Sequence, residues 1–80
     1  MTLTNAIQKR IIELCTNRGI TINKLSTISG MSQSTINNIF MRQDAKPTVS
    51  TIKKMCDGLE ISLVEFFDSK SFYELEQEIQ

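Results

Sequence analysis

The chain has 80 residues, of which 40% are hydrophobic and 22% are charged, with one proline and three glycines. This composition is typical of a single small globular domain and argues against disorder. The N-terminus lacks the apolar core of a signal peptide, and no apolar run approaches the roughly 20 residues that a membrane span requires. We therefore expect a cytoplasmic protein without a membrane partner.

The formal net charge of zero hides an uneven distribution of charge along the chain. Residues 1–56 carry eight Lys and Arg against two acids, a net charge of +6, whereas residues 57–80 carry seven acids against one Lys, a net charge of −6. A basic first part fits contacts with phosphates. The acidic end is expected to lie away from such a partner or against another basic surface.

The residue types that most enzymes and metal sites use are scarce. Histidine is absent, and the two cysteines, Cys15 and Cys56, both fall inside predicted helices, where we expect reduced, buried thiols. The basic part has no carboxylate pair, no phosphate-binding glycine loop and no nucleophile beside a base. The sequence thus predicts a protein that is not an enzyme, with no metal, cofactor or small-molecule substrate.

The first predicted helix begins near residue 4 and ends at a glycine. Thr4 or Asn5 is a candidate N-cap, and Gly19 follows the helix as a C′ residue. Ile12 falls off the inward face, so it is either partly exposed or covered by the C-terminal segment. The inward face at helical spacing consists of Ile7, Ile11, Leu14 and Cys15.

Residues 22–39 have the spacing of a helix-turn-helix, two short helices that meet at a tight corner. Gly30 suits a corner that needs positive φ, and Ser26 is small enough for the two helices to approach closely. Thr21 is a candidate N-cap for the first helix and Ser32 for the second. The predicted buried face consists of Leu25, Ile28, Met31, Ile36, Ile39 and Phe40.

The outward face of the second of these helices carries only uncharged polar groups. It holds Gln33, Ser34, Thr35, Asn37 and Asn38. Amides and hydroxyls both donate and accept, which is the capacity that reading base edges in a major groove requires, and no acid is present to repel phosphate. The alternative is an ordinary solvated helix face, but its position directly after the corner favours a recognition helix.

Two neighbouring segments are candidates for contacts with the DNA backbone. The first turn after Thr21, with Asn23 and Lys24, offers free amides and a cation to a phosphate. The loop after the recognition helix carries Arg42 and Lys46, although ordinary solvated charge explains either one equally well.

The rest of the chain predicts three further helices. Thr48 or Ser50 caps a fourth helix whose inward residues are Ile52, Met55, Cys56 and Leu59, and Ser62 caps a short fifth helix with Leu63, Phe66 and Phe67. Residues 1–69 then form one domain. Residues 70–80 form an acidic tail, in which Ser71 and Glu74 match a capping box. The apolar face of the tail, formed by Phe72, Leu75 and Ile79, must pack on its own domain or on a second chain, and we favour a contribution to dimerisation.

In order and spacing, residues from about Ile7 to Phe67 resemble the Cro and phage-repressor type of helix-turn-helix, the five-helix lambda-repressor-like DNA-binding domain. The resemblance implies an all-α fold with five helices, to which this chain adds a short C-terminal helix. The residues that carry it are Leu14, Gly19, Leu25, Gly30, Met31, Ser32, Ser34, Thr35, Ile36, Ile39, Pro47, Ile52, Leu59, Ile61, Ser62, Leu63, Phe66 and Phe67.

The resemblance also implies a function. Members of this family are DNA-binding transcriptional regulators, commonly repressors, that bind palindromic operators in double-stranded DNA as homodimers. Base contacts would carry over to Gln33, Ser34, Asn37 and Asn38. Contacts with the DNA backbone would fall to Thr21, Asn23, Lys24, Thr35, Arg42 and Lys46.

Four positions depart from the family pattern. Ile22 replaces a frequent glutamine that supports the recognition helix, and Cys15 with Phe40 replaces a frequent buried arginine and glutamate pair, an exchange that is often neutral for stability. Arg42 replaces the usual glycine, at a cost of roughly 1 kcal/mol if positive φ is retained. A second hypothesis remains: a protein-interaction or antitoxin-like adaptor on the same scaffold, which the zero net charge favours.

Overall fold

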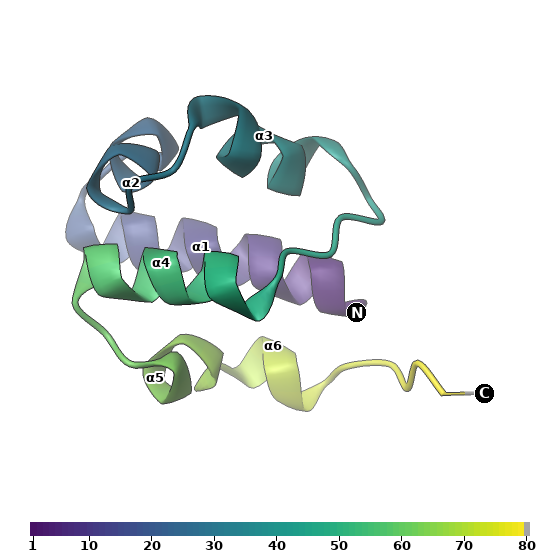
Figure 1. Ribbon diagram of the computed structural model, residues 1–80. Helices are drawn as coiled ribbons and strands as arrows, with labels where there is room; N and C mark the ends of the chain where they lie inside the picture. Colours follow the sequence, from purple (N-terminus) through teal and green to yellow (C-terminus); the bar gives the residue numbers. More distant parts are fainter. Residues whose placement is uncertain (80) are drawn as a thin grey trace.

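The computed structural model describes residues 1–79 and arranges six helices in three layers, with α2 and α3 over α1 and α4, and with α5 and α6 on the opposite side (Figure 1). Both the all-helical fold and the short additional C-terminal helix are confirmed. The helices are α1 (Leu3–Arg18), α2 (Ile22–Ile28), α3 (Gln33–Met41), α4 (Val49–Leu59), α5 (Leu63–Phe67) and α6 (Lys70–Tyr73).

Side-chain caps set the starts of the two helices in the helix-turn-helix, as predicted. The Thr21 hydroxyl accepts from the Lys24 amide at 3.0 Å, and the Ser32 hydroxyl accepts from the Thr35 amide at 3.2 Å. Between them Gly30 adopts φ 67°, a left-handed conformation that glycine reaches without strain. The corner therefore forms from local chemistry alone.

Caps at the other helices were predicted with mixed success. Thr48 caps α4, and Ser62 forms a capping box with Glu65 at the start of α5. The predicted caps of the first and last helices were wrong. Thr2 caps α1. Thr4 is buried, and its hydroxyl donates a hydrogen bond to the Ala45 carbonyl at 2.6 Å. The tertiary contact of Thr4 outweighs its tendency to cap.

The C-terminal helix is shorter than the predicted helix and begins earlier. Its N-cap position is Ser69, and Ser71 lies inside the helix, where it is buried, so the capping box expected at Ser71 does not form. Beyond Tyr73 the described residues have no regular structure, and residue 80, the end of the predicted helix, lies outside them. Four residues form a helix here because α6 packs against α1 rather than standing alone in water.

The core lies between α1, α2, α3, α4 and α5. The predicted inward faces of α1 and α4 are buried as expected, as are Leu25, Ile36, Ile39 and Phe66. Two ring contacts join α5 to α6, Phe66 with Phe72 and Phe67 with Phe72, and the centroids of the second pair are 5.0 Å apart. Ile12 is 50% exposed, which settles the two alternatives left open for it. The prediction that Ile28 is buried was wrong, because its side chain is 38% exposed.

The close approach of α2 to α4 explains the exposure of Ile28. A Cβ atom added at Gly58 would lie 2.7 Å from the Ser29 hydroxyl and 3.0 Å from the Ile28 carbonyl oxygen. The backbone of Ile28 therefore faces α4, and its side chain does not fill the space between the helices. A glycine at position 58 permits this contact between two backbones.

Polar side chains of α1 hold the C-terminal ends of three other helices. Gln8 donates to the Ile39 carbonyl at the end of α3 at 2.6 Å. Arg18 donates to the Leu59 carbonyl at the end of α4 at 3.0 Å. Arg10 donates to the Phe66 and Glu65 carbonyls of α5, both at 2.7 Å. The last carbonyls of a helix lack partners within the helix, so α1 supplies donors that the core needs.

We expect Arg10→Met to lower the free energy of unfolding by about 2 to 4 kcal/mol, because two carbonyls of α5 and the Glu13 carboxylate would lose a charged donor while the apolar stem is kept. Urea denaturation followed by circular dichroism measures this. Lys9→Met, which removes the same charge from an exposed neighbour, is the matched control and should change stability little. Equal losses for the two variants would contradict the role given to Arg10.

Candidate nucleic-acid interface

The outward face of α3 is free of contacts that would hide it. Ile36 and Ile39 bury the opposite face of the helix, with exposures of 0% and 4%. The tail does not fold over this face and runs instead on the far side of the molecule, below α1 (Figure 1). All five polar residues of the predicted face, Gln33, Ser34, Thr35, Asn37 and Asn38, are exposed.

Three amide side chains of α2 and α3 form one hydrogen-bonded cluster, which we call the amide cluster: Asn23, Gln33 and Asn37. The Gln33 Nε2 group donates to Asn23 Oδ1 at 2.5 Å and to Asn37 Oδ1 at 3.1 Å. The Ser26 hydroxyl, buried between the helices, lies 3.3 Å from Gln33 Oε1 and donates to the Asn23 carbonyl at 2.7 Å. The cluster joins the two helices at their exposed edge.

The sequence did not predict this cluster, because Asn23 was assigned to the DNA backbone and Gln33 to bases. In the family, a glutamine that supports the recognition helix is frequent at the position of Ile22. In this structure the next residue, Asn23, makes such a contact with α3, since it accepts a hydrogen bond from Gln33. Ile22 packs against the core instead. The signal in the sequence was a spacing of ten residues between two amides that flank a helix-turn-helix corner.

The remaining residues of the face differ in how firmly they are held. The Thr35 hydroxyl lies 2.8 Å from the Ser32 hydroxyl, which fixes it at the start of α3. Within residues 1–79, the side chains of Ser34 and Asn38 make no hydrogen bond to another residue. Their full donor and acceptor capacity is therefore available to a ligand.

A hollow of about 400 Å³ lies between the end of α3 and the start of α4. Arg42 and Lys46 both contribute to it, but Arg42 pairs with Asp44 at 3.5 Å, so Lys46 is the freer of the two cations for a phosphate. Arg42 has φ −120°, which removes the strain expected from replacing a glycine there. Thr48 and Thr51 also line the hollow, although the sequence indicated Thr48 only as a helix cap and did not single out Thr51.

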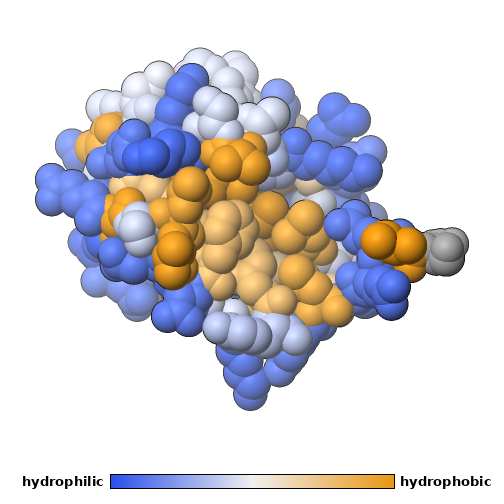
Figure 2. Space-filling model, turned by 60° about the horizontal axis from the view of Figure 1, so that its bottom comes forward, coloured by the Kyte–Doolittle hydropathy of each residue, from blue (hydrophilic) through white to orange (hydrophobic). Residues whose placement is uncertain are grey.

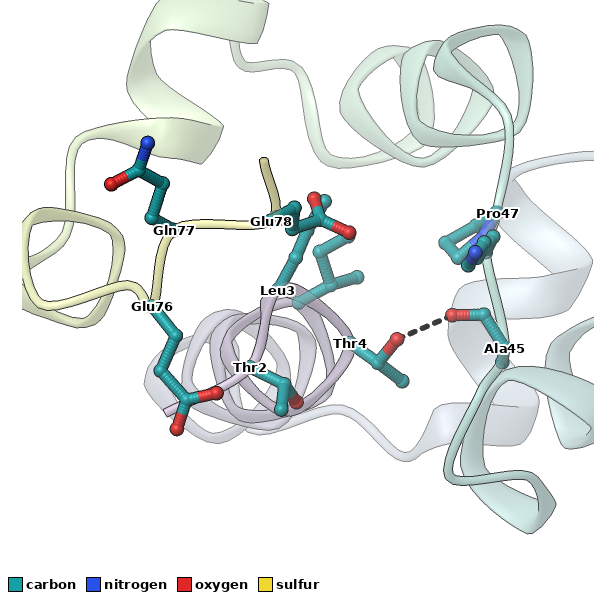
Figure 3. A pocket seen from close by; sticks show the side chains of 10 residues that line it. Thr2, Leu3, Thr4, Ala45, Pro47, Glu76, Gln77 and Glu78 are labelled. Atoms are coloured by element: carbon teal, nitrogen blue, oxygen red, sulfur yellow. Dashed lines mark hydrogen bonds between the residues drawn. The ribbon is translucent and has the colours of Figure 1, made fainter. Parts of the chain in front are cut away.

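The acidic tail borders a second hollow, of about 250 Å³, behind the loop that carries Lys46. In Figure 3, Glu76 and Glu78 line this hollow together with Thr2 and Leu3. The figure also shows the hydrogen bond that the Thr4 hydroxyl donates to the Ala45 carbonyl. Glu76 also bonds with the first residue, since its amide donates to the Met1 carbonyl at 3.1 Å. The tail thus folds back on its own domain, one of the two arrangements that the sequence allowed.

An apolar surface covers part of α5 and α6. Figure 2 shows a continuous hydrophobic area on this side of the molecule, away from α3. Val64 and Tyr73 are both 79% exposed and border a hollow of about 400 Å³ with Leu63, Phe67 and Asp68. The sequence did not reveal this surface, because Val64 and Tyr73 lie on different helices and border one hollow only after α5 and α6 have packed.

The two thiols lie within the core, away from the polar face. Burial raises the pKa of Cys15, against the opposing effect of Arg18, and burial likewise raises the pKa of Cys56. Both are free cysteines. Within residues 1–79, no cluster of three or more His, Cys, Asp or Glu side chains is placed to hold a metal, and none of the helices combines the length and apolar character of a membrane span.

Comparison with known proteins agrees with this architecture. A helix-turn-helix family model matches residues 11–66. The HTH-type transcriptional regulator SlrR of Bacillus subtilis (strain 168) is 38% identical over 63 residues, which cover 78% of this chain but 41% of SlrR. The crystal structure of the prophage Lp1 protein 11 superposes with a TM-score of 0.82 at 36% identity, covering 94% of this chain and 99% of that one.

The chain therefore belongs to the helix-turn-helix family of the Cro and phage-repressor type, a family of DNA-binding regulators and not of enzymes. The chain spans less than half the length of SlrR.

Proposed function

We propose that this protein is a sequence-specific DNA-binding transcriptional regulator that inserts α3 into the major groove. The observation that carries the proposal is the exposed, acid-free polar face of α3, held against α2 by the amide cluster. An α-helix fits the major groove, and amide and hydroxyl groups match the donors and acceptors of base edges. The name of SlrR, a transcriptional regulator, agrees with this function.

The proposed interface separates sequence reading from affinity. Base reading falls to the α3 face, Gln33, Ser34, Asn37 and Asn38. The DNA backbone would be contacted by Thr21, Asn23, Lys24, Thr35, Arg42 and Lys46. Contacts with phosphates set register and salt dependence, whereas contacts with base edges set sequence.

We further propose that the protein acts in the cytoplasm as a repressor, binding a palindromic operator as a homodimer that occludes polymerase. The apolar surface of α5 and α6 supports the dimer, because its residues Val64 and Tyr73 are exposed in a single chain and a second copy could cover them. Because a two-fold interface pairs the same patch from both chains, each copy would offer an exposed apolar side chain and a hollow.

We expect Gln33→Ala to weaken binding to a selected operator by about 1 to 3 kcal/mol and to change binding to random DNA little, because it disrupts base reading. Lys46→Ala should weaken binding to both DNAs and reduce the salt dependence, since its partner would be a phosphate. Fluorescence anisotropy titrations at several salt concentrations measure both effects.

Lys70→Ala is the matched control for Lys46→Ala. Its side chain is 90% exposed and lies on α6, on the opposite side of the molecule from α3. The control should leave both affinities nearly unchanged. Equal losses for Gln33→Ala and Lys46→Ala on both DNAs would contradict the separation of reading from affinity.

We expect Val64→Glu to shift the free protein from dimer to monomer, because a charge would enter an apolar interface. Sedimentation equilibrium measures the association constant. Val49→Glu is the control: it introduces the same charge at a valine that is 67% exposed at the start of α4. A dimer that survives Val64→Glu unchanged would exclude this surface as the interface.

The apolar surface also favours a second candidate, a protein-interaction or antitoxin-like adaptor whose partner protein binds α5 and α6. DNA binding separates the two candidates. Binding to random duplex that weakens steeply with salt supports the regulator, whereas no binding at low salt supports the adaptor.

A further inference from the structure

The side-chain amide of Gln33 already has its hydrogen bonds within the protein. A glutamine Nε2 group carries two protons, and both are used, one toward Asn23 Oδ1 at 2.5 Å and one toward Asn37 Oδ1 at 3.1 Å. To read an adenine, an amide must offer a free donor and a free acceptor to the N7 and N6 positions. Gln33 would have to give up at least one of these bonds to do so.

The cluster instead leaves a different group facing outward. Asn37 accepts from Gln33 through Oδ1, so its Nδ2 group, with two protons, is directed away from that bond. Asn37 is exposed, and within residues 1–79 its Nδ2 group has no hydrogen-bond partner. Toward a DNA groove, Asn37 therefore presents donors and no acceptor.

A group that only donates discriminates between bases. Guanine shows two acceptors in the major groove, O6 and N7, whereas adenine shows one acceptor and one donor, thymine shows one acceptor beside its methyl group, and cytosine shows a donor. We propose that Asn37 reads a guanine and that Gln33 and Asn23 are positioning residues that orient its amide. This inference rests on the proposed insertion of α3 into the major groove. It refines the roles given above, because Gln33 and Asn23 would act by orienting Asn37 rather than by contacting a base or the DNA backbone themselves.

The orientation of Asn37 depends on the donor at residue 33. In Gln33→Glu the carboxylate only accepts, so Asn37 would turn its Nδ2 group toward residue 33 and present Oδ1 to the DNA. The preferred base should then change from guanine to cytosine, whose N4 group donates. A loss of packing alone would weaken binding without exchanging one base for another.

The experiment begins with selection of bound sequences from a random duplex pool by the wild-type protein. Anisotropy titrations then compare the four base pairs at each position of the half-site, for the wild type and for Asn37→Ala, Asn23→Ala, Gln33→Glu and Asn17→Ala. We expect one position where the wild type prefers guanine by about tenfold, where Asn37→Ala and Asn23→Ala remove the preference, and where Gln33→Glu moves it to cytosine. Asn17→Ala is the matched control, since it removes an exposed amide of α1 outside the proposed interface, and it should keep guanine. All four substituted residues are exposed, and thermal melts confirm folding.

Two results would overturn the inference, and they differ from failure of the proposed function. The first is an adenine preference that depends on Gln33 and is unaffected by Asn23→Ala and Asn37→Ala, which would make Gln33 the direct reader. The second is cytosine at the position read by Asn37 in the wild type, which would mean that the amides face the opposite way. Both results leave DNA binding intact, whereas a wild-type protein that binds no duplex at low salt refutes the proposed function itself.

Discussion

The packing of this small domain depends on donors that α1 provides to the C-terminal ends of α3, α4 and α5. Helix ends expose carbonyls without partners, and in a chain of 80 residues few are far from the core. Gln8, Arg18 and Arg10 meet this need with hydrogen bonds of 2.6 to 3.0 Å. They also fix where each helix ends relative to α1. The recognition helix is therefore held at its C-terminal end by Gln8, in addition to the burial of Ile36 and Ile39.

The exposed face of α3 is restrained from its other end by contacts with α2. Ser26 is 3% exposed and lies where the two helices meet. Its hydroxyl donates to the Asn23 carbonyl and contacts Gln33 Oε1, so it joins the buried contact between the helices to the exposed amide cluster. Side chains that are already ordered lose less conformational entropy on binding than free ones do. The amide cluster thus connects the packing of the helix-turn-helix to the groups that we propose face the DNA, while Ser34 and Asn38 stay free to adapt.

The acidic tail lies away from the outward face of α3. Lys46 lies on the loop beside α3 and lines the hollows on both sides of that loop, one of which Glu76 and Glu78 also border. Attachment of the tail to Met1 keeps its carboxylates off the face of α3. Approach to a phosphate backbone is therefore favoured on one side, which orients an encounter even though the net charge is zero.

The sequence by itself determined the number and type of the main helices and the inward faces of α1 and α4. It also determined the corner at Gly30 and the caps Thr21 and Ser32. These features follow from caps, glycine conformation and helical periodicity, which are local properties of the chain. Tertiary structure decided where Thr4, Ile28 and Ser71 lie, since a contact with a distant loop or helix outweighed the local preference in each case. It also decided how Asn23, Gln33 and Asn37 pair and that Val64 and Tyr73 share one apolar surface. Those relations join residues on different helices, and only the packing of the helices brings them within hydrogen-bonding or van der Waals distance.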